Sequence, residues 1–583
     1  MKYKLLAASI LATLSTSAIS ATYQLSELGT LEGAKHSFVT DVSESGHMIG
    51  AANGLYNLPI DISYIDFTEN VVESAYSSEE NAFELSDKVI TFTLDDIENN
   101  NAVDNNPDAH DFMVSFLGSS TLGITSNFEY QKLSSLVGIR FDNGSAIEQP
   151  LFDVASVDYD GLTRSNTNFY NAVSEDGVSV GWGSAPFDKV LFTPDDEDEA
   201  ETWFTHEFIE RGMVVSADGL QVPIIPEFNE YGGTSRANDI IKTNSGYTVV
   251  GNVSIDIPED RLENIEDNCD NEDEPTSVCI NLLNSSVSVF NKRAVKWELD
   301  EFLNINSTEI LGLAFTPDED ETEDDAYTST ALAINANGTV VGSSHTRYEN
   351  NDNTIITMPV YFKDGEVTAF LEQENDSGQS GKAVAINDND VITGYTTIVV
   401  ENTRRNKFFY HDIKTGSTVF PTDYFNSSSS YGNDINNQGY IVGEGEVGVS
   451  DNTRRKEAFI YKIGEDKITN LNDLLPCFES DGETSYAYTM VEAKVINENN
   501  EIFGVATKTV EKRDTLGGIV TDVNGNTEFE SVAVAVKLTP IANGEIDSCS
   551  VAELEENERS SASFPWYTLF LLPLVGLRRI FRF

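Results

Sequence analysis

Basic residues are scarce in this sequence of 583 residues, where 36 lysines and arginines stand against 97 aspartates and glutamates. The formal net charge of −61 repels polyanions, so we do not expect nucleic acid as a partner. Histidine is scarcer still, with six residues, and none of them lies in an H-E-x-x-H motif. The G-x-S-x-G motif of serine hydrolases is also missing. The sequence therefore carries the signature of neither hydrolase class.

Apolar runs of transmembrane length are absent as well, but a short run lies at each end of the chain. Residues 1–21 have the form of a signal peptide, in which two lysines precede an apolar stretch and small residues follow it. Cleavage is expected after Ser20 or Ala21. An ordinary N-terminal membrane helix would need a longer apolar run. We therefore expect an exported protein.

The C-terminal end carries the second short run. A Glu-rich and polar linker, residues 551–563, leads into residues 564–583, where an apolar segment is followed by Arg578 and Arg579. The segment is short for a stable membrane span, and its arginines would stay on the cytoplasmic side. It predicts engagement with the inner membrane, at least transiently. The alternative to a removed signal is a permanent anchor that holds the protein on the periplasmic side.

Four cysteines in an exported chain predict two disulfides. Cys269 and Cys279 bracket a short acidic loop and are the expected first pair. Cys477 and Cys549 would form the second pair and tie the last repeat to the C-terminal strands. Zinc fits the cysteines poorly because no histidine lies near either pair.

The chain is rich in copies of one phrase, which is most regular at Ala331–Gly342, ALAINANGTVVG. An extended stretch enters a turn of asparagine and glycine and leaves it as a β-branched strand, which predicts a β-hairpin. The turn needs a residue that accepts positive φ, and the copies place glycine, aspartate or asparagine there. Six further copies are Val39–Gly50, Asn171–Gly181, Ala237–Gly251, Ala383–Gly394, Asn433–Gly443 and Ala493–Gly504.

A second element follows most copies: an apolar strand that ends in an aromatic residue, then a polar turn and another strand, as in Pro359–Leu371. Each unit thus offers about four strands in about 50 residues, which is typical of a propeller blade. We predict that residues 22–550 form a single all-β propeller of seven, alternatively eight, four-stranded blades, the eighth lying between Gly50 and Gly181. The strand near Tyr23 would pair with C-terminal strands and close the ring. A two-sheet β-sandwich array is the alternative architecture.

The phrase A-x-x-I-N-x-x-G-x-x-V-G and the aromatic strand after it resemble the extracellular HAF-type repeat, and Tyr23–Gly46 resembles the lead-in of that repeat. The whole chain is similar to a family of exported proteins of unknown function from marine Gram-negative bacteria. This resemblance brings no catalytic residues. The C-terminal segment resembles sorting signals of the GlyGly-CTERM type, which a rhomboid-type protease removes before type II secretion to the cell surface or medium. Its usual glycine pair is replaced by a stretch that includes Ser561 and Ser563.

Acidic residues gather in two dense runs, Asp195–Glu201 and Asp318–Asp325, each after a Phe-Thr-Pro sequence. We expect the runs to be equivalent solvated loops at blade tips. Clustered carboxylates can also bind calcium, and Asp318, Asp320 and Asp324 are the candidate ligands, although neither run has the spacing and glycine of an EF-hand loop. No other cofactor is indicated.

Two functions remain open. The first is a monomeric, non-catalytic binding protein, secreted or at the cell surface, whose loops bind an extracellular or envelope protein or a glycan. The second is a hydrolase or lyase that acts on an extracellular polymer. The second requires several of the histidines to converge with acids in one pocket; they are His36, His47, His110, His206, His345 and His411. The missing motifs favour the binding protein.

Overall fold

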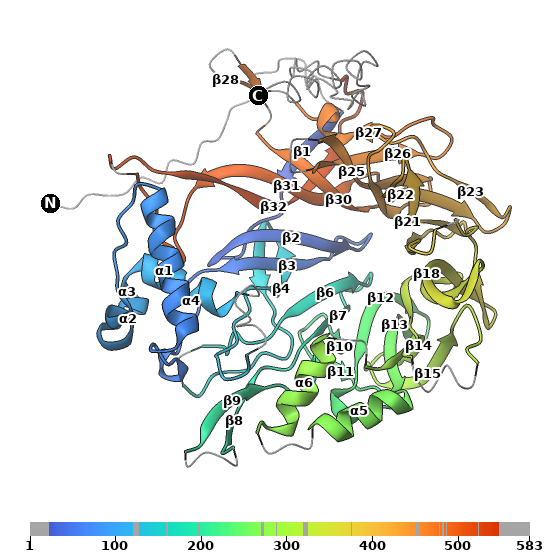
Figure 1. Ribbon diagram of the computed structural model, residues 1–583. Coiled ribbons are helices and arrows are strands. Elements are labelled where there is room, and N and C mark those ends of the chain that lie inside the picture. The colour runs from blue at the N-terminus through green and yellow to red at the C-terminus, as the bar shows by residue number, and fades with distance from the viewer. Residues whose placement is uncertain are drawn as a thin grey trace, which may run out of the picture.

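Seven four-stranded antiparallel sheets, the blades, surround one axis in the computed structural model (Figure 1). The inner strand of each blade contacts the inner strands of both neighbours, and the last contacts the first. The fold is therefore the predicted all-β propeller with seven blades. The structure describes residues 22–119, 127–158, 161–194, 199–269, 273–286, 289–318, 325–374, 376–449, 454–476, 478–480, 483–485, 487–522 and 524–546.

The strands of each blade follow one another from the axis to the rim, except in the last blade. Blade 1 consists of β2 (Ala34–Val42), β3 (Met48–Leu55), β4 (Val137–Asp142) and β5 (Ser145–Glu148). Blade 2 consists of β6 (Asn168–Val173), β7 (Ser179–Gly183), β10 (Arg211–Val215) and β11 (Gln221–Ile224). Blade 3 consists of β12 (Ser235–Thr243), β13 (Gly246–Asp256), β14 (Asn291–Leu299) and β15 (Ile305–Gly312). Blade 4 consists of β16 (Ser329–Ile334), β17 (Val340–Tyr348), β18 (Asn351–Lys363) and β19 (Glu366–Ala369). Blade 5 consists of β20 (Gly381–Ile386), β21 (Val391–Val400), β22 (Thr403–Asp412) and β23 (Ser417–Val419). Blade 6 consists of β24 (Ser430–Ile435), β25 (Tyr440–Val449), β26 (Arg454–Lys462) and β27 (Thr469–Asn470).

Blade 7 is built from both ends of the chain. Strands β30 (Thr489–Ile496), β31 (Ile502–Glu511) and β32 (Phe529–Pro540) come from the C-terminal part, and β1 (Tyr23–Glu27) adds the outer strand. β1 runs antiparallel to β32, with Tyr23 opposite Pro540 and Glu27 opposite Val536. The expected closure of the ring by the N-terminal strand is therefore confirmed.

The repeated phrase forms the hairpin between the first two strands of every blade. Its turn residues have positive φ, as predicted, including Gly338 (80°) and the non-glycine residues Asp390 (61°) and Asn500 (59°). The glycine that ends the phrase is required for a different, steric reason. A β-bulge in the inner strand, between Ala331 and Ala333 in blade 4, brings a backbone carbonyl against the second strand. A Cβ on Gly342 would lie 1.9 Å from that carbonyl oxygen, so only glycine fits.

The same bulge and the same close approach recur in all seven blades. The distance from an added Cβ to the facing carbonyl oxygen is 1.8 to 2.1 Å at each closing glycine. These glycines are Gly50, Gly181, Gly251, Gly342, Gly394, Gly443 and Gly504. The phrase thus encodes both a turn and a bulge.

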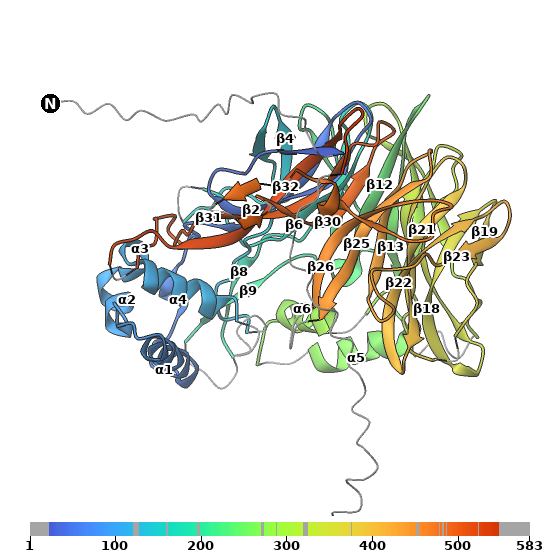
Figure 2. The same cartoon turned by 90° about the horizontal axis from the view of Figure 1, so that it is seen from above.

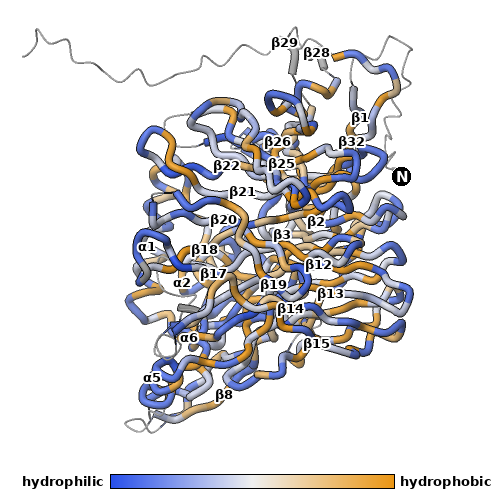
Figure 3. Tube along the Cα trace, turned by 90° about the vertical axis from the view of Figure 1, so that its right-hand side faces the viewer, coloured by the Kyte–Doolittle hydropathy of each residue, from blue (hydrophilic) through white to orange (hydrophobic). Residues whose placement is uncertain are grey.

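The hydrophobic core is divided among the blade interfaces, with one cluster of buried side chains at each. Between blades 5 and 6, for example, Phe408 packs against Phe459 and Tyr461, with ring centroids 4.9 and 5.7 Å apart. Hydrophobic residues follow the strands, whereas many turns are hydrophilic (Figure 3). Burial of this kind is the main force that holds neighbouring blades together.

The gap between Gly50 and Gly181 holds a helical insertion in place of an eighth blade. It contains α1 (Asn70–Leu85), α2 (Leu94–Asn100), α3 (Ala102–Asn105) and α4 (Pro107–Leu117), after a 3₁₀ turn at Ile62–Tyr64. Its apolar residues recur at helical spacing, as Phe112 and Phe116 do, and build a small core of their own. Asn106 caps α4 by accepting hydrogen bonds from the backbone of Asp108 and Ala109.

Further insertions join this one on the same face of the propeller. Blade 2 adds the hairpin of β8 (Asp188–Phe192) and β9 (Glu201–Thr205), and blade 3 adds α5 (Glu259–Cys269) and α6 (Thr276–Ser286). All lie between the second and third strands of a blade, and Figure 2 shows the helices gathered on one side of the blades. We call α1–α4, β8–β9, α5–α6 and the tip of the β31–β32 hairpin the cap. Minor elements outside it are 3₁₀ turns at Glu230–Gly232 and Leu471–Leu474 and a hairpin of β28 (Phe478–Ser480) and β29 (Glu483–Ser485).

Candidate functional site

The parts of the cap contact one another across blade boundaries. The backbone N–H of Phe204 in β9 donates to the carbonyl of Phe128 at 2.6 Å, which ties blade 2 to the blade 1 insertion. The hydroxyl of Thr205 donates to the amide oxygen of Asn281 in α6 at 2.9 Å. Nδ1 of His110 in α4 lies 2.8 Å from the hydroxyl of Thr515 in the β31–β32 tip. The cap is therefore one continuous surface over blades 7, 1, 2 and 3.

The opposite face, which we call the turn face, carries the seven phrase turns and a ladder of asparagines. The side-chain amide of Asn335 in blade 4 donates to the carbonyl of Asn387 in blade 5 at 3.0 Å. The side-chain amide of Asn387 donates to the carbonyl of Asn436 in blade 6 at 3.0 Å, and that of Asn436 donates to the carbonyl of Asn497 in blade 7 at 3.1 Å. Each asparagine is buried. The ladder therefore links four consecutive blades, because the phrase places asparagine first in each of their turns.

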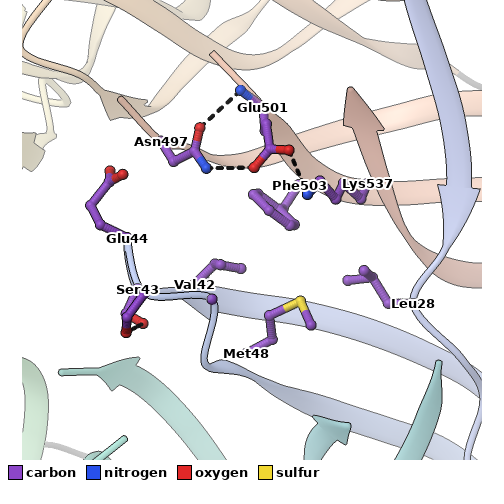
Figure 4. Close-up of a pocket in the computed structure, with 11 residues that line it drawn as sticks. Leu28, Val42, Ser43, Glu44, Met48, Asn497, Glu501, Phe503 and Lys537 are labelled. Atoms are coloured by element: carbon purple, nitrogen blue, oxygen red, sulfur yellow. Dashed lines mark hydrogen bonds and ion pairs between the residues drawn. The ribbon is translucent and has the colours of Figure 1, made fainter. Parts of the chain in front are cut away.

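The ladder stops where blade 7 meets blade 1. Blade 1 has Ser43 in place of the asparagine. The side-chain amide of Asn497 donates instead to Glu501 Oε2 in its own blade, at 2.8 Å. A pocket of about 180 Å³ opens at this point (Figure 4). Its lining consists of Leu28, Val42, Ser43, Glu44, Ser45, Gly46, Met48, Asn497, Glu501, Phe503 and Lys537.

The blade 1 wall of the pocket carries Val42 and Met48, whereas the blade 7 wall carries Phe503 beside the charged pair Glu501 and Lys537. Figure 4 shows Met48 and Phe503 facing each other across it. Lys537 Nζ lies 2.6 Å from Glu501 Oε1 and 5.4 Å from the centre of the Phe503 ring. Glu44 stands at the rim and accepts a hydrogen bond from the backbone of Glu498 at 2.9 Å. Burial and the nearby carboxylates raise the pKa of Glu44.

A second pocket, of about 320 Å³, lies between blades 2 and 3, where the asparagine ladder is also absent. Its lining includes the carboxylates of Asp176 and Glu301, and Asp176 is already paired. Asp176 Oδ2 lies 2.5 Å from Lys242 Nζ and accepts a hydrogen bond from the Tyr247 hydroxyl at 2.7 Å. Burial alone would raise the pKa of Asp176, but these two partners lower it to about 2.

Three aspartates lie on the inner strands of different blades. Asp41, Asp239 and Asp434 each follow the bulge of an inner strand. Each accepts a hydrogen bond from a backbone N–H in the next blade, at 2.7 or 2.8 Å; the donors are Val173, Ile334 and Ile496. Burial raises the pKa of Asp41 to about 8 and those of Asp239 and Asp434 to about 6, with mutual repulsion adding to the rise for Asp41 and Asp434. Each aspartate thus links two blades through a half-buried carboxyl group.

The raised pKa of Asp41 predicts a pH-dependent stability. The folded protein holds the proton up to about pH 8, whereas the unfolded chain releases it near pH 4. The stability that Asp41 contributes is therefore present at low pH and lost as the pH rises through this window. We expect Asp41→Asn, which keeps an acceptor for Val173, to flatten the fall by roughly 1 kcal/mol per pH unit in urea unfolding between pH 5 and 8.

The control for this experiment is Asp364→Asn, which makes the same substitution in an exposed turn. Because both variants replace one carboxyl group by an amide, only the environment of Asp41 separates their pH profiles. Parallel profiles for the two variants would contradict the prediction.

The six histidines do not converge. His36 Nδ1 accepts from the backbone of Ala533, and His345 Nδ1 accepts from that of Thr328. His411 Nδ1 lies 2.8 Å from the Thr418 hydroxyl in blade 5. The other three lie in separate places: His47 beside Gly177 on the turn face, His110 in α4, and His206 against Phe187 after β9. The arrangement that a histidine-based hydrolase requires is not formed.

The remaining predicted site residues are only partly described. Cys269 and Cys279 form a disulfide. Asp318 accepts a hydrogen bond from Arg347 at 3.2 Å, and Asp320 and Asp324 lie outside the described residues. So do Cys477, Cys549, Ser20, Ala21, Ser561, Ser563, Arg578 and Arg579. Within the described ranges, no group of three metal-ligating side chains occurs, and no helix is long and apolar enough to cross a membrane.

The disulfide predicts a local effect. Cys269 and Cys279 are 10 residues apart and join α5 to α6. Closing a loop of this size stabilises a structure by about 3 kcal/mol in the chain-entropy model. We expect the double variant Cys269→Ser and Cys279→Ser to open α5–α6 to hydrogen exchange while blades 4 to 6 stay protected. Equal exchange in both regions would show that the bridge supports the whole propeller.

Sequence reasoning missed the pocket between blades 7 and 1, although a signal for it was present. The phrase reads I-N-x-x-G at Ile334–Gly338 but V-S-E-S-G at Val42–Gly46. Serine at this position still offers its backbone carbonyl, but the Asn497 amide that would donate to it is bonded to Glu501 in its own blade instead. Only the structure shows that the bridge is missing and that a space opens there.

Three solved structures illustrate what the chain is similar to. The β-propeller domain of the Trilobed protease from Pyrococcus furiosus has 10% identity and a TM-score of 0.30, covering 68% of this chain and 86% of that one. The acylaminoacyl peptidase of Pyrococcus horikoshii has 11% identity and a TM-score of 0.31, covering 69% and 47%. A putative TolB from Agrobacterium tumefaciens has 10% identity and a TM-score of 0.23, covering 43% and 86%. Structural similarities as weak as these give no information about function.

The sequence comparisons are more direct. A search of curated proteins found no match. One family model matches residues 1–580, which is nearly the whole chain, and its description is "Protein of unknown function (DUF3466)". The seven-bladed propeller with its cap and turn-face pocket is thus a member of the DUF3466 family of proteins of unknown function.

Proposed function

We propose that this protein is an exported, non-catalytic binding protein that acts at the cell surface or in the medium. The observation that carries the proposal is the cap. Four consecutive blades place insertions on one face, and the insertions contact one another. Insertions in loops add surface without changing the blades that support them, so they are where a propeller gains a specific partner.

The exposure of the cap supports a role in binding. Leu85 at the end of α1 is 88% exposed, and Val89 just after it is 84% exposed. Two large apolar side chains held out in water by a helical insertion suit contact with another molecule better than they suit the solvent. A protein or a glycan is the partner class that we propose, because the net charge of −61 disfavours polyanions.

Export is supported by the sequence of the two ends and by the cysteines. The first 21 residues have the pattern of a signal peptide, and the disulfide suits an oxidising compartment. The C-terminal segment, residues 564–583, resembles a sorting signal that is removed before release. Retention by that segment in the inner membrane is the alternative location.

The location is tested by the intact mass and the fractionation of the protein from its native host. We expect a chain that starts near Ala21 and ends between Ser560 and Ser563, on the surface or in the medium. A full-length C-terminus in the inner membrane would overturn the surface assignment.

The binding role is tested by photo-crosslinking in the native host. A crosslinking residue at Leu85 is expected to give a discrete adduct. The same residue at Ile310, which is 46% exposed on the outer strand of blade 3, serves as the matched control on the rim. Identical products from both positions, or none from Leu85, would contradict binding through the cap.

A further inference from the structure

One histidine lies where three insertions of the cap meet. His206 follows β9 directly, and Asn281 of α6 holds its backbone by accepting from the His206 N–H at 2.9 Å and donating to the His206 carbonyl at 3.1 Å. The His206 ring packs in a T-shaped contact against Phe187, just before β8, with ring centroids 4.5 Å apart. Phe187 in turn lies 6.4 Å from Phe128 of the blade 1 insertion. We call this meeting point of β8–β9, α6 and the blade 1 insertion the joint.

The His206 ring makes no hydrogen bond in the joint. Both ring nitrogens are shielded from solvent, and neither has a partner in the part of the chain that the structure describes. The most buried histidines differ, because His110 and His411 each have a ring nitrogen 2.8 Å from a threonine hydroxyl. Buried polar atoms without partners are rare in folded proteins. The closed joint therefore leaves unsatisfied a group that water would bond if the joint were open.

A nearby cation makes protonation of this ring more costly still. Lys132, from the blade 1 insertion, donates to the carbonyl of Asn127, and its ammonium group lies 5.1 Å from the centre of the Phe128 ring. Burial is the main cause that lowers the pKa of His206, and the charge of Lys132 is the second. Together they lower this pKa to about 4.

The other elements of the joint do not offset the charge of Lys132. The helix α6 contains no charged residue. On the β8–β9 hairpin, Lys189 is paired with Asp158 at 2.5 Å, and Glu207, which follows His206 in the chain, is exposed. Among the described residues, Lys132 is thus the one charged group that acts on the His206 ring.

We propose that His206 is an acid-sensitive latch of the cap, whose protonation in a mildly acidic medium opens the joint and separates β9 from α6. A protonated ring has two N–H donors, and the described residues of the closed joint offer no acceptor for either. Opening supplies water to both. Because an exported protein meets the pH of its surroundings, the latch would regulate the cap surface. That regulation rests on the function proposed above, whereas the opening itself does not.

The direction of the effect follows from the two states of the joint. In the closed joint the ring stays neutral down to about pH 4, whereas in an open, hydrated joint it takes up a proton near pH 6.5. The stability that neutral His206 allows is therefore complete above about pH 6.5 and is lost as the pH falls toward 4. From pH 7.5 to pH 5, the ratio of open to closed joint should rise roughly tenfold to thirtyfold.

Hydrogen exchange of the full chain, without any partner, tests the latch. Protection is measured at about pH 5 and about pH 7.5 and corrected for the intrinsic exchange rate. We expect the protection of residues 199–210 and of α6 to fall roughly tenfold to thirtyfold at the lower pH. Residues 430–449 of blade 6, a blade without histidine, are the internal reference and should keep their protection. Asp41 has the opposite effect, since it stabilises the propeller as the pH falls.

Two variants assign the effect to the His206 ring. His206→Phe and His206→Gln do not titrate in this range, so each should give the same protection of residues 199–210 at both pH values. The glutamine variant serves if the phenylalanine variant does not fold. The matched control is His47→Phe, which removes an exposed histidine from the turn face and should keep the full pH dependence.

Protection of residues 199–210 that does not change with pH in the native sequence would overturn the proposal. An equal fall in the His206 variants would do so as well, because another group would then be responsible. An equal fall in blade 6 would show general acid unfolding instead of a latch. Crosslinking at Leu85 needs a partner and this experiment does not, so failure of the binding role is distinguishable from failure of the latch.

Discussion

Gly342→Ala is expected to destabilise the propeller by about 3 kcal/mol or more in urea unfolding. The added Cβ would lie 1.9 Å from the carbonyl oxygen of Thr330, a contact that no rotamer can relieve. Either the bulge in β16 or the pairing of β16 with β17 has to give way. Because inner strands pack against both neighbouring blades, the damage should spread beyond blade 4.

Gly338→Ala in the same hairpin is the matched control, since it adds the same single carbon. Gly338 has φ of 80°, and nothing lies within 4 Å of an added Cβ. The cost there is the left-handed conformation alone, about 1–2 kcal/mol. Equal losses for the two variants would show that backbone conformation, and not the close carbonyl, explains the closing glycine.

Deletion of residues 22–33 is expected to abolish the stable monomer. The segment contributes the outer strand of blade 7 and buries Tyr23, Leu28 and Leu31. Burial of each is worth about 1.5–3 kcal/mol, so the sum approaches the whole stability of a typical domain. The exposed edge of β32 would also invite pairing with other chains. Size-exclusion chromatography and thermal melting measure both effects.

A synthetic peptide with the sequence of residues 22–33 provides the control, because it can occupy the vacant edge in trans. We expect it to restore the monomer and to raise the melting temperature of the deletion variant in proportion to its concentration. A peptide of scrambled sequence should do neither. A deletion variant that melts like the intact protein would contradict the importance of the closure.

The sequence predicted the parts of the fold that depend on local chemistry. The turn residues Gly338, Asp390 and Asn500 all adopt the expected positive φ, because turn conformation is decided within four residues. The pairing of β1 with the C-terminal strands was also predictable, since a ring of repeats with an incomplete last unit needs an outer strand. Both predictions rest on one repeated phrase.

The other features depend on contacts between distant residues. The closing glycine is required by a carbonyl on another strand, and the pocket lies between Ser43 and Asn497, which are more than 450 residues apart in the chain. The insertion before β4 was missed for a different reason. Its longest helix, α1, buries only Val72, and α2 has only seven residues, so the apolar pattern of this region indicated neither clear strands nor clear helices. The cap could not be assembled from sequence because its parts meet only in three dimensions.

The closure of blade 7 also fixes the order of events during synthesis. Ser26 in β1 and Lys537 in β32 are hydrogen-bonded partners 511 residues apart. At about 5–20 residues per second, a ribosome takes roughly half a minute to two minutes between making the first and the second. For that time β1 has no strand to pair with, and six blades can form before the ring can shut. Every nascent chain must therefore pass through a state in which the ring is open. The pairing of β1 with β32 is then the last step of folding.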